Sequence, residues 1–395
     1  MKGSALLARA VVAAVCAGMS LGGCAARKSE DADAVVGLRL IGEQRIARRQ
    51  VFQGTLVGGL SSIDYDSRGG TWIMASDDRS ELGPARFYTA RLDYDARGFR
   101  AVKLESVHTF RQADGSAYPA LKDAAARGGE VADIEAVRFD PLGDGIWYAS
   151  EGSDALATGP FVKQAGGEGA YRSTLPLPDM FKSRRDKTAG PRGNLSFEAL
   201  AFAPDGRSLW VGMEAPLYQD GAPANPERGA VSRFTRFDRN GKVLAQYAYQ
   251  VDRVQGLPAP GRLGDNGVSE MLVVDSRHLL ALERSGVQDA AGRFAFFIRL
   301  YLVDVDGATN IAAFPTLDGA VYTPLKKHLL MDFNRAGLDK VDNLEGMSWG
   351  PVLANGHRSL VLISDDNFSA DEVTQLLAFE VQPAGRPPSA YALYR

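Results

Sequence analysis

Glu135-Ala-Val-Arg-Phe139, followed after a short turn by Ile146-Trp-Tyr-Ala-Ser-Glu151, is the part of this sequence that decides the fold. Alternation in the first run places Glu135, Val137 and Phe139 on one face of a strand. The midpoint between the two acids is Gly143, inside a turn-forming Pro-Leu-Gly-Asp-Gly segment. Paired residues of an antiparallel hairpin lie equally far from its turn. We therefore predict a hairpin that carries one carboxylate on each strand at its open end.

The same pattern occurs five times along the chain. The first runs begin at Ser61, Glu135, Glu198, Glu270 and Glu345. The second runs lead to acids at Asp77, Glu151, Glu214, Glu283 and Asp365. The midpoints of these pairs fall on residues typical of turns, at Gly69, Gly143, Gly206, the Ser276–Arg277 bond and Asn355. Five hairpins with the same arrangement of acids are therefore expected.

The spacing of the repeats indicates the architecture. Successive repeats start 63 to 75 residues apart, which leaves room for two more strands in each unit. Four-stranded units repeated around an axis make an all-β propeller. Residues 36–46 are expected to pair with the last unit and close the ring. Five blades are visible, and a sixth, divergent blade could lie in 152–195 or 306–342. A β-helix or solenoid is less favoured, because its repeats are usually shorter and its strands parallel.

The N-terminus resembles an export signal. Lys2 and Arg9 precede an apolar run that ends at Leu21, too short to span a bilayer. It leads into Leu21-Gly-Gly-Cys24, which resembles the bacterial lipobox, so Cys24 is the expected lipidation site. The alternative is an ordinary signal peptide that happens to end near a cysteine. We expect a lipoprotein signal peptide at 1–23, a tether at 24–35 and a propeller domain at 36–395.

Composition sets limits on location and partners. Ala25 after the cysteine resembles the outer-membrane sorting pattern, so we expect a lipid-anchored protein of the cell envelope, on the outer membrane and facing the periplasm or the exterior. The net charge of −3 argues against nucleic-acid binding. The only two cysteines, Cys16 and Cys24, leave no disulfide in the propeller domain. We expect a monomer.

The repeated acids form the candidate metal site. In a propeller the first strands line a central channel in one direction, so the acids should gather at one rim. Such crowding raises carboxylate pKa values, and a bound cation relieves it. Oxygen ligands in a roomy site favour Ca²⁺. Alternatively, each acid accepts backbone hydrogen bonds at the top of its blade. The expected ligands are Asp77, Glu135, Glu151, Glu198, Glu214, Glu270, Glu283, Glu345 and Asp365.

Other polar residues lie beside these acids. Asn194 and Asn343 precede two of the strands and could add carbonyl oxygens or contact a substrate. Arg79 and Arg284 follow Asp78 and Glu283, and each could bind an anionic group of a substrate or form a salt bridge between blades.

Residues 182–192 form a basic stretch that we interpret as a mobile loop, either solvated or able to fold over the rim and hold an anionic ligand. There is no Gly-x-Ser-x-Gly motif, and the four histidines share no spacing, so no catalytic residue can be named.

At these motifs the sequence resembles the bacterial phytase-like family, also described as "esterase-like activity of phytase". The resemblance covers about residues 50 to 383. It implies a hydrolase of ester or phosphoester bonds, similar to the alkaline phytases, which are six-bladed propellers that use Ca²⁺ in an acidic central site. The matching segments are Gly59-Leu-Ser-Ser-Ile63, Ile134-Glu-Ala-Val137, Ser196-Phe-Glu-Ala-Leu200, Gly267-Val-Ser-Glu-Met271, Asn343-Leu-Glu-Gly-Met347 and Ile363-Ser-Asp-Asp-Asn367.

The functional hypothesis is an exported, phytase-like hydrolase that uses Ca²⁺ held by a ring of carboxylates at the channel. Its substrate would be a small anionic or ester molecule, and bound metal would lower the pKa of a water. Two alternatives stay open at this point. One is a lactonase-type Ca²⁺ propeller hydrolase, and the other is a surface propeller that binds ligands without catalysis.

Overall fold

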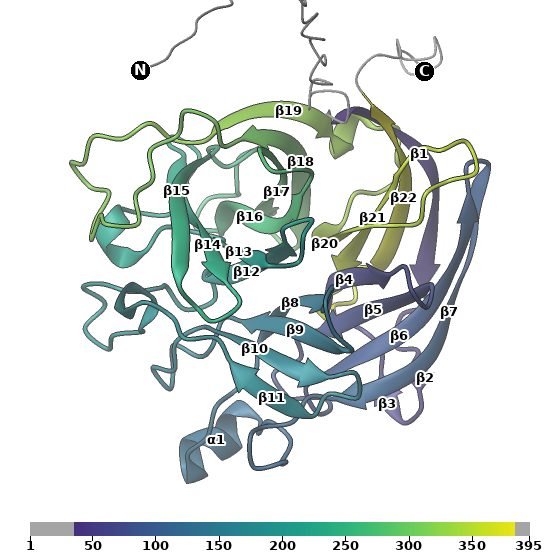
Figure 1. Ribbon diagram of the computed structural model, residues 1–395, viewed down its shortest axis with the longest axis horizontal. Coiled ribbons are helices and arrows are strands. Elements are labelled where there is room, and N and C mark those ends of the chain that lie inside the picture. The colour runs from purple at the N-terminus through teal and green to yellow at the C-terminus, as the bar shows by residue number, and fades with distance from the viewer. Residues whose placement is uncertain (1–34, 384–395) are drawn as a thin grey trace, which may run out of the picture.

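The computed structural model describes residues 35–383 as a ring of five four-stranded antiparallel sheets around a central channel (Figure 1). Blade 1 contains β4 (Leu60–Asp66), β5 (Thr71–Ser76), β6 (Arg86–Asp95) and β7 (Gly98–Thr109). Blade 2 contains β8 (Ile134–Phe139), β9 (Gly145–Ser150), β10 (Phe161–Gly166) and β11 (Tyr171–Thr174). Blade 3 contains β12 (Phe197–Phe202), β13 (Ser208–Met213), β14 (Ala230–Asp238) and β15 (Val243–Val251).

Blade 4 contains β16 (Gly264–Val273), β17 (His278–Gln288), β18 (Phe294–Asp304) and β19 (Lys326–Asp332). Blade 5 contains β20 (Asn343–Trp349), β21 (Ser359–Asp365), β22 (Thr374–Pro383) and β1 (Val35–Ile46). A two-stranded sheet of β2 (Val51–Phe52) and β3 (Thr55–Leu56) and the short helix α1 (Leu121–Arg127) lie outside the blades.

The propeller prediction is confirmed, with five blades. The segments in which a sixth blade could have lain supply outer strands instead: 152–195 contains β10 and β11 of blade 2, and 306–342 contains β19 of blade 4. The six-bladed possibility is therefore wrong for residues 35–383. Neighbouring inner strands contact one another in the order β4, β8, β12, β16, β20 and back to β4.

The N-terminal strand closes the ring, as expected from its sequence. In β1, Leu38 pairs with Val381 of β22 and Glu43 pairs with Leu377. Blade 5 is thus built from both ends of the described chain. The expected signal peptide, Cys24 and all but the last residue of the expected tether lie outside the described residues. Among residues 35–383, no helix is long and apolar enough to cross a membrane.

The core lies between the blades. One apolar residue of each inner strand is fully buried there, and all five occupy equivalent positions, at Ile63, Val137, Leu200, Met271 and Met347. Burying such a side chain contributes roughly 1.5–3 kcal/mol. These contacts fix the inner strands, and with them the side chains that alternate into the channel.

A β-bulge recurs in every inner hairpin. In blade 2, Ile134 pairs with Ser150 and Ala136 with Ala149, so Glu135 is the extra residue. A bulge re-aims the side chain of its extra residue. The extra residues of the five blades are Ser61, Glu135, Glu198, Ser269 and Glu345.

Candidate metal centre at the channel mouth

The bulge residues and the residues at the ends of the second inner strands meet at one mouth of the channel. The charged residues among them line a cavity of about 300 Å³, here called the acidic pocket. At the bulge position, carboxylates come from blades 2, 3 and 5, whereas blades 1 and 4 have Ser61 and Ser269 there. Seven of the nine expected ligands lie here: Asp77, Glu135, Glu151, Glu198, Glu214, Glu345 and Asp365.

Blade 4 departs from the expectation. Its bulge residue is Ser269, because Val268 pairs with Glu283 and Glu270 with Leu282. In each of the other blades, the residue before the bulge pairs with a residue of the second strand that is followed by an acid. In blade 4 the residue before the bulge pairs with Glu283, and the residue that follows is Arg284. The expected acids of this blade are thus each one residue out of register, and a one-residue shift on a strand turns a side chain to the other face. Blade 4 thus has a serine at the bulge, as blade 1 does, and it is the blade with an arginine where the other four have an acid.

Glu270 lies inside the channel, beyond the acidic pocket. Its carboxylate receives a 2.5 Å hydrogen bond from Arg138, a residue of β8 in blade 2. The Arg138 guanidinium also donates to the carbonyls of Ile63 at 2.8 Å and of Met347 at 3.3 Å. Arg138 and Glu270 are 3% and 0% exposed. This pair therefore fills the channel between the acidic pocket and a second cavity at the opposite mouth, which Arg138 also lines.

Glu283 points away from the pocket, on the opposite face of β17 from Arg284. It accepts hydrogen bonds from Tyr249 Oη at 2.8 Å and Lys327 Nζ at 2.5 Å. Asn266 Nδ2 donates to its second oxygen at 3.1 Å. Glu283 thus belongs to a buried polar network between blades 3 and 4. Neither Glu270 nor Glu283 lines the acidic pocket.

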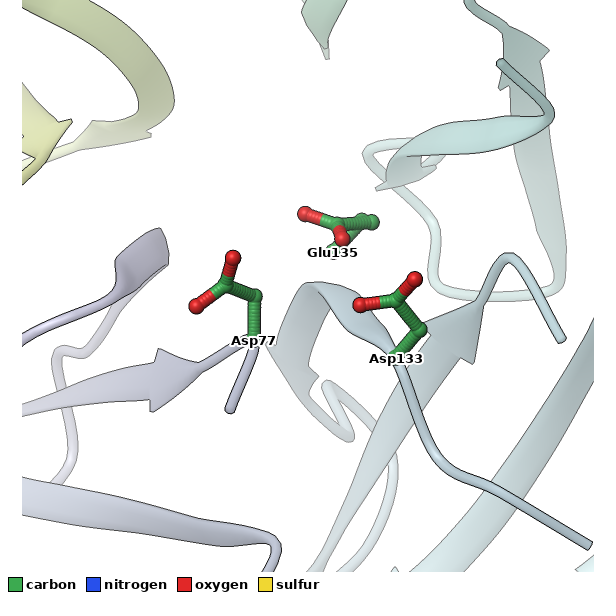
Figure 2. A group of neighbouring side chains, drawn as sticks. All are labelled: Asp77, Asp133 and Glu135. Carbon is green, nitrogen blue, oxygen red and sulfur yellow. The ribbon is translucent and has the colours of Figure 1, made fainter. Parts of the chain in front are cut away.

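Two groups of three carboxylates lie close enough to share a cation. Asp77, Asp133 and Glu135 each offer an oxygen, and these oxygens lie within 4.8 Å of one another. Glu135, Glu151 and Glu198 form a second group with the same limit. Figure 2 shows the first group, in which three carboxyl groups from blades 1 and 2 face a common space. Glu135 belongs to both groups and lies between them.

The crowding has the expected effect on protonation. Burial, and then repulsion by Glu198, Asp133 and other acids, raises the pKa of Glu135 well above its usual value. Burial and Glu151 do the same for the pKa of Glu198. The pKa of Glu214 rises to about 8, mainly through burial, although Arg284 opposes the rise. Without a cation, Glu214 is therefore mainly protonated at neutral pH, and burial and repulsion favour the protonated forms of Glu135 and Glu198 as well.

The alternative hypothesis, that these acids accept backbone hydrogen bonds at the tops of their blades, is correct for some of them. Glu151 accepts from the Ser196 amide, and Asp365 accepts from the Asn367 amide at 2.9 Å. For Asp77, Glu135 and Glu198 no hydrogen bond from a backbone amide is found within the described chain. These three carboxylates have no such partner to favour their charged form.

The two asparagines have different surroundings. Asn343 donates from Nδ2 to Glu345 at 2.9 Å, and its buried Oδ1 has no hydrogen-bond partner among the described residues. Asn194 accepts from Arg79, whose Nε lies 3.0 Å from Asp133. An unpaired buried carbonyl oxygen is costly. Asn343 lines the pocket, so this unpaired oxygen is a candidate ligand for a cation.

Both arginines form ion pairs between blades, though not with the acids beside them in sequence. Arg79 of blade 1 pairs with Asp133, next to β8 of blade 2. Arg284 of blade 4 lies 2.8 Å from Glu214 of blade 3 and 3.4 Å from Glu345 of blade 5. Two positive charges therefore lie among the carboxylates, on different sides of the pocket.

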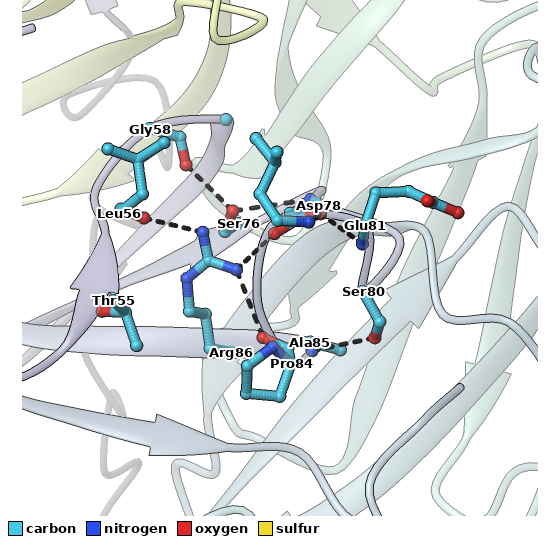
Figure 3. A network of polar contacts seen from close by, with 12 residues as sticks. Thr55, Leu56, Gly58, Ser76, Asp78, Ser80, Glu81, Pro84, Ala85 and Arg86 are labelled. Carbon is cyan, nitrogen blue, oxygen red and sulfur yellow. Dashed lines mark hydrogen bonds and ion pairs between the residues drawn. The ribbon is translucent and has the colours of Figure 1, made fainter. Parts of the chain in front are cut away.

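Asp78 stabilises the loop that contains Asp77 and Arg79. It is buried and pairs with Arg86 at 2.6 Å, while Arg86 also donates to the Leu56 carbonyl at 2.7 Å (Figure 3). The other oxygen of Asp78 accepts from the amide of Glu81 at 2.8 Å. This network holds the loop, and so fixes the residues on either side of Asp78.

Sequence reasoning missed Asp133 and Asp265, which also belong to the site. Asp133 stands two residues before Glu135, as Asn343 stands two before Glu345. The alternation used to place Glu135 could have found it. The basic stretch is held by its last residue: Arg192 donates to the Pro216 carbonyl at 3.1 Å and lies 4.2 Å from the centre of the Tyr218 ring. None of the four histidines lines the acidic pocket.

A sequence model of the phytase-like family, described as esterase-like activity of phytase, matches residues 55–368. The chain belongs to this family. The match covers most of the chain and includes all the residues that line the acidic pocket, so the phytase-like resemblance inferred from the motifs is confirmed. No curated protein sequence matches the chain.

Several solved structures are similar to this phytase-like protein. A GH43 endo-arabinanase from Bacillus licheniformis has a TM-score of 0.36 and 12% identity, covering 82% of this chain and 95% of its own. A GH32 β-fructofuranosidase from Bombyx mori has a TM-score of 0.38 and 10% identity, covering 82% and 60%. A putative 6-phosphogluconolactonase from Bacteroides uniformis has a TM-score of 0.32 and 12% identity, covering 84% and 85%. Similarities at this level say nothing about substrate.

Proposed function

We propose that this phytase-like protein is a hydrolase of phosphoester or ester bonds that holds Ca²⁺ in the acidic pocket. The observation that carries the proposal is the convergence of seven repeat carboxylates on one cavity, with Asp133 close to two of them, without enough cations to balance these acids. Only Arg79 and Arg284 lie among these acids. A protein gains nothing in stability from such a cluster unless a ligand neutralises it.

The donor set fits Ca²⁺. Oxygens that share one Ca²⁺ lie at most about 5 Å apart, since each bond is roughly 2.3–2.6 Å long. Both carboxylate groups meet this limit, with oxygens within 4.8 Å. All the nearby donors are oxygens, including the unpaired Asn343 Oδ1, and no histidine or cysteine lies among them. Such a set favours a hard cation over zinc or copper.

In this proposal, Asp77, Asp133, Glu135, Glu151 and Glu198 would hold the metal, with Asn343 beside them. Bound Ca²⁺ would supply electrophilic polarisation of the substrate and a lowered pKa for a water molecule. Arg284 lies on the opposite wall, where it orients Glu214 and Glu345. Glu214, whose pKa is raised to about 8, stays largely protonated at neutral pH and can donate a proton to a leaving group.

Calcium binding and turnover test the proposal together. Metal-free protein is titrated with Ca²⁺ by calorimetry, and hydrolysis of p-nitrophenyl phosphate and p-nitrophenyl acetate is measured with and without chelator. Glu135→Gln and Glu198→Gln should each weaken Ca²⁺ binding tenfold or more, a change of about 1.4 kcal/mol. Glu168→Gln, on an exposed turn, is the matched control and should bind Ca²⁺ like the native protein.

The outcomes separate the possibilities left by the sequence. Absence of Ca²⁺ binding would overturn the metal proposal. Binding of Ca²⁺ that raises thermal stability, with no turnover of any ester, phosphoester or lactone substrate, would support a non-enzymatic ligand-binding propeller instead.

We also propose that the protein is exported and anchored to the outer membrane through Cys24, and that it acts as a monomer. This proposal rests on the motif Leu21-Gly-Gly-Cys24. An anchored propeller would present its acidic pocket to small substrates of the cell envelope.

A further inference from the structure

Blade 4 extends beyond the rim of the acidic pocket. In blades 1, 2 and 3 the first strand starts one residue before the bulge, but β16 starts at Gly264, five residues before Ser269. The second strand continues in the same way, since β17 ends at Gln288, four residues after Arg284. At about 3.3 Å per residue, this overhang stands roughly 13 Å beyond the bulge level.

One face of the overhang is directed at the pocket. Asp265 pairs with Gly286, which pairs with Phe296, and Gln288 pairs with Phe294. Residues paired across strands share a face. The pocket-lining residues of blade 4 all lie on this face: Leu263, Asp265, Arg284, Phe294 and Phe296. The opposite face carries Glu283 and the buried network described above.

The end of this face is apolar and open to solvent. Leu263 is 65% exposed and Phe294 is 37% exposed. Both residues line the acidic pocket. Elsewhere the pocket wall consists mainly of carboxylates, amides and the two arginines. Exposed apolar groups that gather at the edge of a polar cavity mark a place where an apolar group binds.

The apolar residues are held in place before any ligand arrives. The rings of Phe294 and Phe296 stack at 5.7 Å with an interplanar angle of 15°. Phe294 lies over Gly286, where an added Cβ would come within 3.2 Å of the ring. The Leu263 carbonyl accepts a 2.9 Å hydrogen bond from the Gln288 amide. Such an ordered surface binds a ligand without losing further side-chain entropy.

Blade 4 is also the blade in which Arg284 stands where the second inner strands of the other four blades lead to an acid. Its charged groups in the pocket, Arg284 and Asp265, have no formal net charge, and Arg284 faces Glu214 and Glu345. A substrate would therefore meet carboxylates, and any cation they hold, on four sides. On the fifth side it would meet Arg284 and Asp265, with an apolar shelf beside them.

We propose that the shelf formed by Leu263, Phe294 and Phe296 is a subsite for the apolar organic group of the substrate. The substrate class is then an ester or phosphoester of an alkyl or aryl group, with its polar centre among the carboxylates. This inference rests on the proposed hydrolase function, because the shelf is assigned to the substrate on the basis of its position beside the acidic pocket.

Binding of non-hydrolysable probes tests the subsite without turnover. Protein loaded with Ca²⁺ is titrated with methylphosphonate and octylphosphonate, and in a second arm with acetate and octanoate. The octyl probe should bind roughly tenfold more tightly or better than the methyl probe, since burying two or three methylenes suffices for that factor. The phosphonate and carboxylate arms distinguish a phosphoester from an ester substrate.

Two variants and a control locate the effect. Leu263→Ser and Phe294→Ser should each lose most of the chain-length preference and leave Ca²⁺ binding unchanged. Leu142→Ser removes a leucine that is 60% exposed in a turn outside the pocket, and should retain the preference. Equal binding of octyl and methyl probes would overturn the subsite. An effect of Leu142→Ser as large as that of the shelf variants would overturn it as well.

The outcomes also separate this inference from the proposed function. Calcium binding and turnover with no chain-length preference would reject the subsite alone. A chain-length preference that the shelf variants abolish, in a protein without Ca²⁺ binding or turnover, would reject the hydrolase and retain an apolar binding site. If the variants instead lose binding to phosphatidylcholine vesicles while binding the phosphonates normally, the shelf faces a membrane and the proposal is wrong.

Discussion

Replacement of Arg138 by methionine tests the structure where the channel is closed. The guanidinium is 3% exposed and serves Glu270 and the carbonyls of Ile63 and Met347. Methionine occupies a similar length but leaves the carboxylate and both carbonyls without their donor. Removing one partner of a buried ion pair costs about 3–5 kcal/mol. Arg138→Met should therefore lower the free energy of unfolding by about that amount at alkaline pH.

The dependence on pH gives the sharper test. Burial raises the pKa of Glu270 to about 7 even though Arg138 lowers it, and burial likewise raises the pKa of Asp64, which also faces Arg138. A carboxyl group whose pKa is raised by folding makes its full contribution to stability at pH values below its ordinary pKa of 4.5. That contribution is lost as the pH rises through the pKa of the folded state. Without Arg138 both pKa values rise further.

In the native protein, the decrease in unfolding free energy that comes from Glu270 is nearly complete near pH 7. In Arg138→Met this decrease continues above that pH. The difference in unfolding free energy should therefore widen above about pH 7, by up to about 1.4 kcal/mol per pH unit. Urea unfolding in chelator at about pH 6, 7 and 8.5 measures it. Arg100→Met, at an exposed site on blade 1, is the control and should show a small, constant difference. A difference for Arg138→Met that is the same at all three pH values would refute the reasoning.

Three further predictions concern the metal, the loop and the anchor. Carboxylates bind Ca²⁺ in their charged form, and burial raises the pKa values of the proposed ligands Glu135 and Glu198 well above their usual range, so the affinity for Ca²⁺ should increase from about pH 6 to 9; calorimetry that gives a flat profile would contradict this. Arg86→Met should cost about 3–5 kcal/mol in urea unfolding, because Arg86 is 0% exposed and pairs with Asp78, and Arg86→Met with Asp78→Leu should recover part of the loss. Cys24→Ser should move the protein from the membrane fraction to the soluble fraction on immunoblots, and an unchanged distribution would reject the lipid anchor.

The fold could be predicted because its evidence is local and repeated. Each hairpin combines strand alternation with a turn at its centre, and five copies of one pattern constrain the fold more than any single copy does. The blade count could not be settled this way. Outer strands such as β10 and β19 belong to long irregular segments with no shared motif, so their partners are evident only in three dimensions.

The error in blade 4 has a geometrical cause. The midpoint test depends only on the sum of two residue numbers, and Ser269 with Arg284 gives the same midpoint as Glu270 with Glu283. It therefore cannot detect a shift of one residue outward on both strands.

A different signal was present in the sequence. In the other four blades a small residue follows the bulge position, at Ser62, Ala136, Ala199 and Gly346. At Gly346 a Cβ would come within 2.9 Å of the Ser62 Cα, so the neighbouring strand leaves little room there. Met271 after Glu270 breaks that pattern. Where a larger residue does occupy the equivalent position in blade 4, as Glu270, it extends into the channel and requires Arg138 as its partner.

The closing strand has a consequence for how the acidic pocket comes into being. β1 and β22 are separated by more than 300 residues of chain, and their pairing completes blade 5. Contacts between such distant segments form late and slowly, because a long loop must first be ordered. During synthesis β1 waits without its partner until β22 has been made. Glu345 and Asp365 are made after the acids of blades 1, 2 and 3, so the full electrostatic repulsion within the pocket arises only when blade 5 joins the ring.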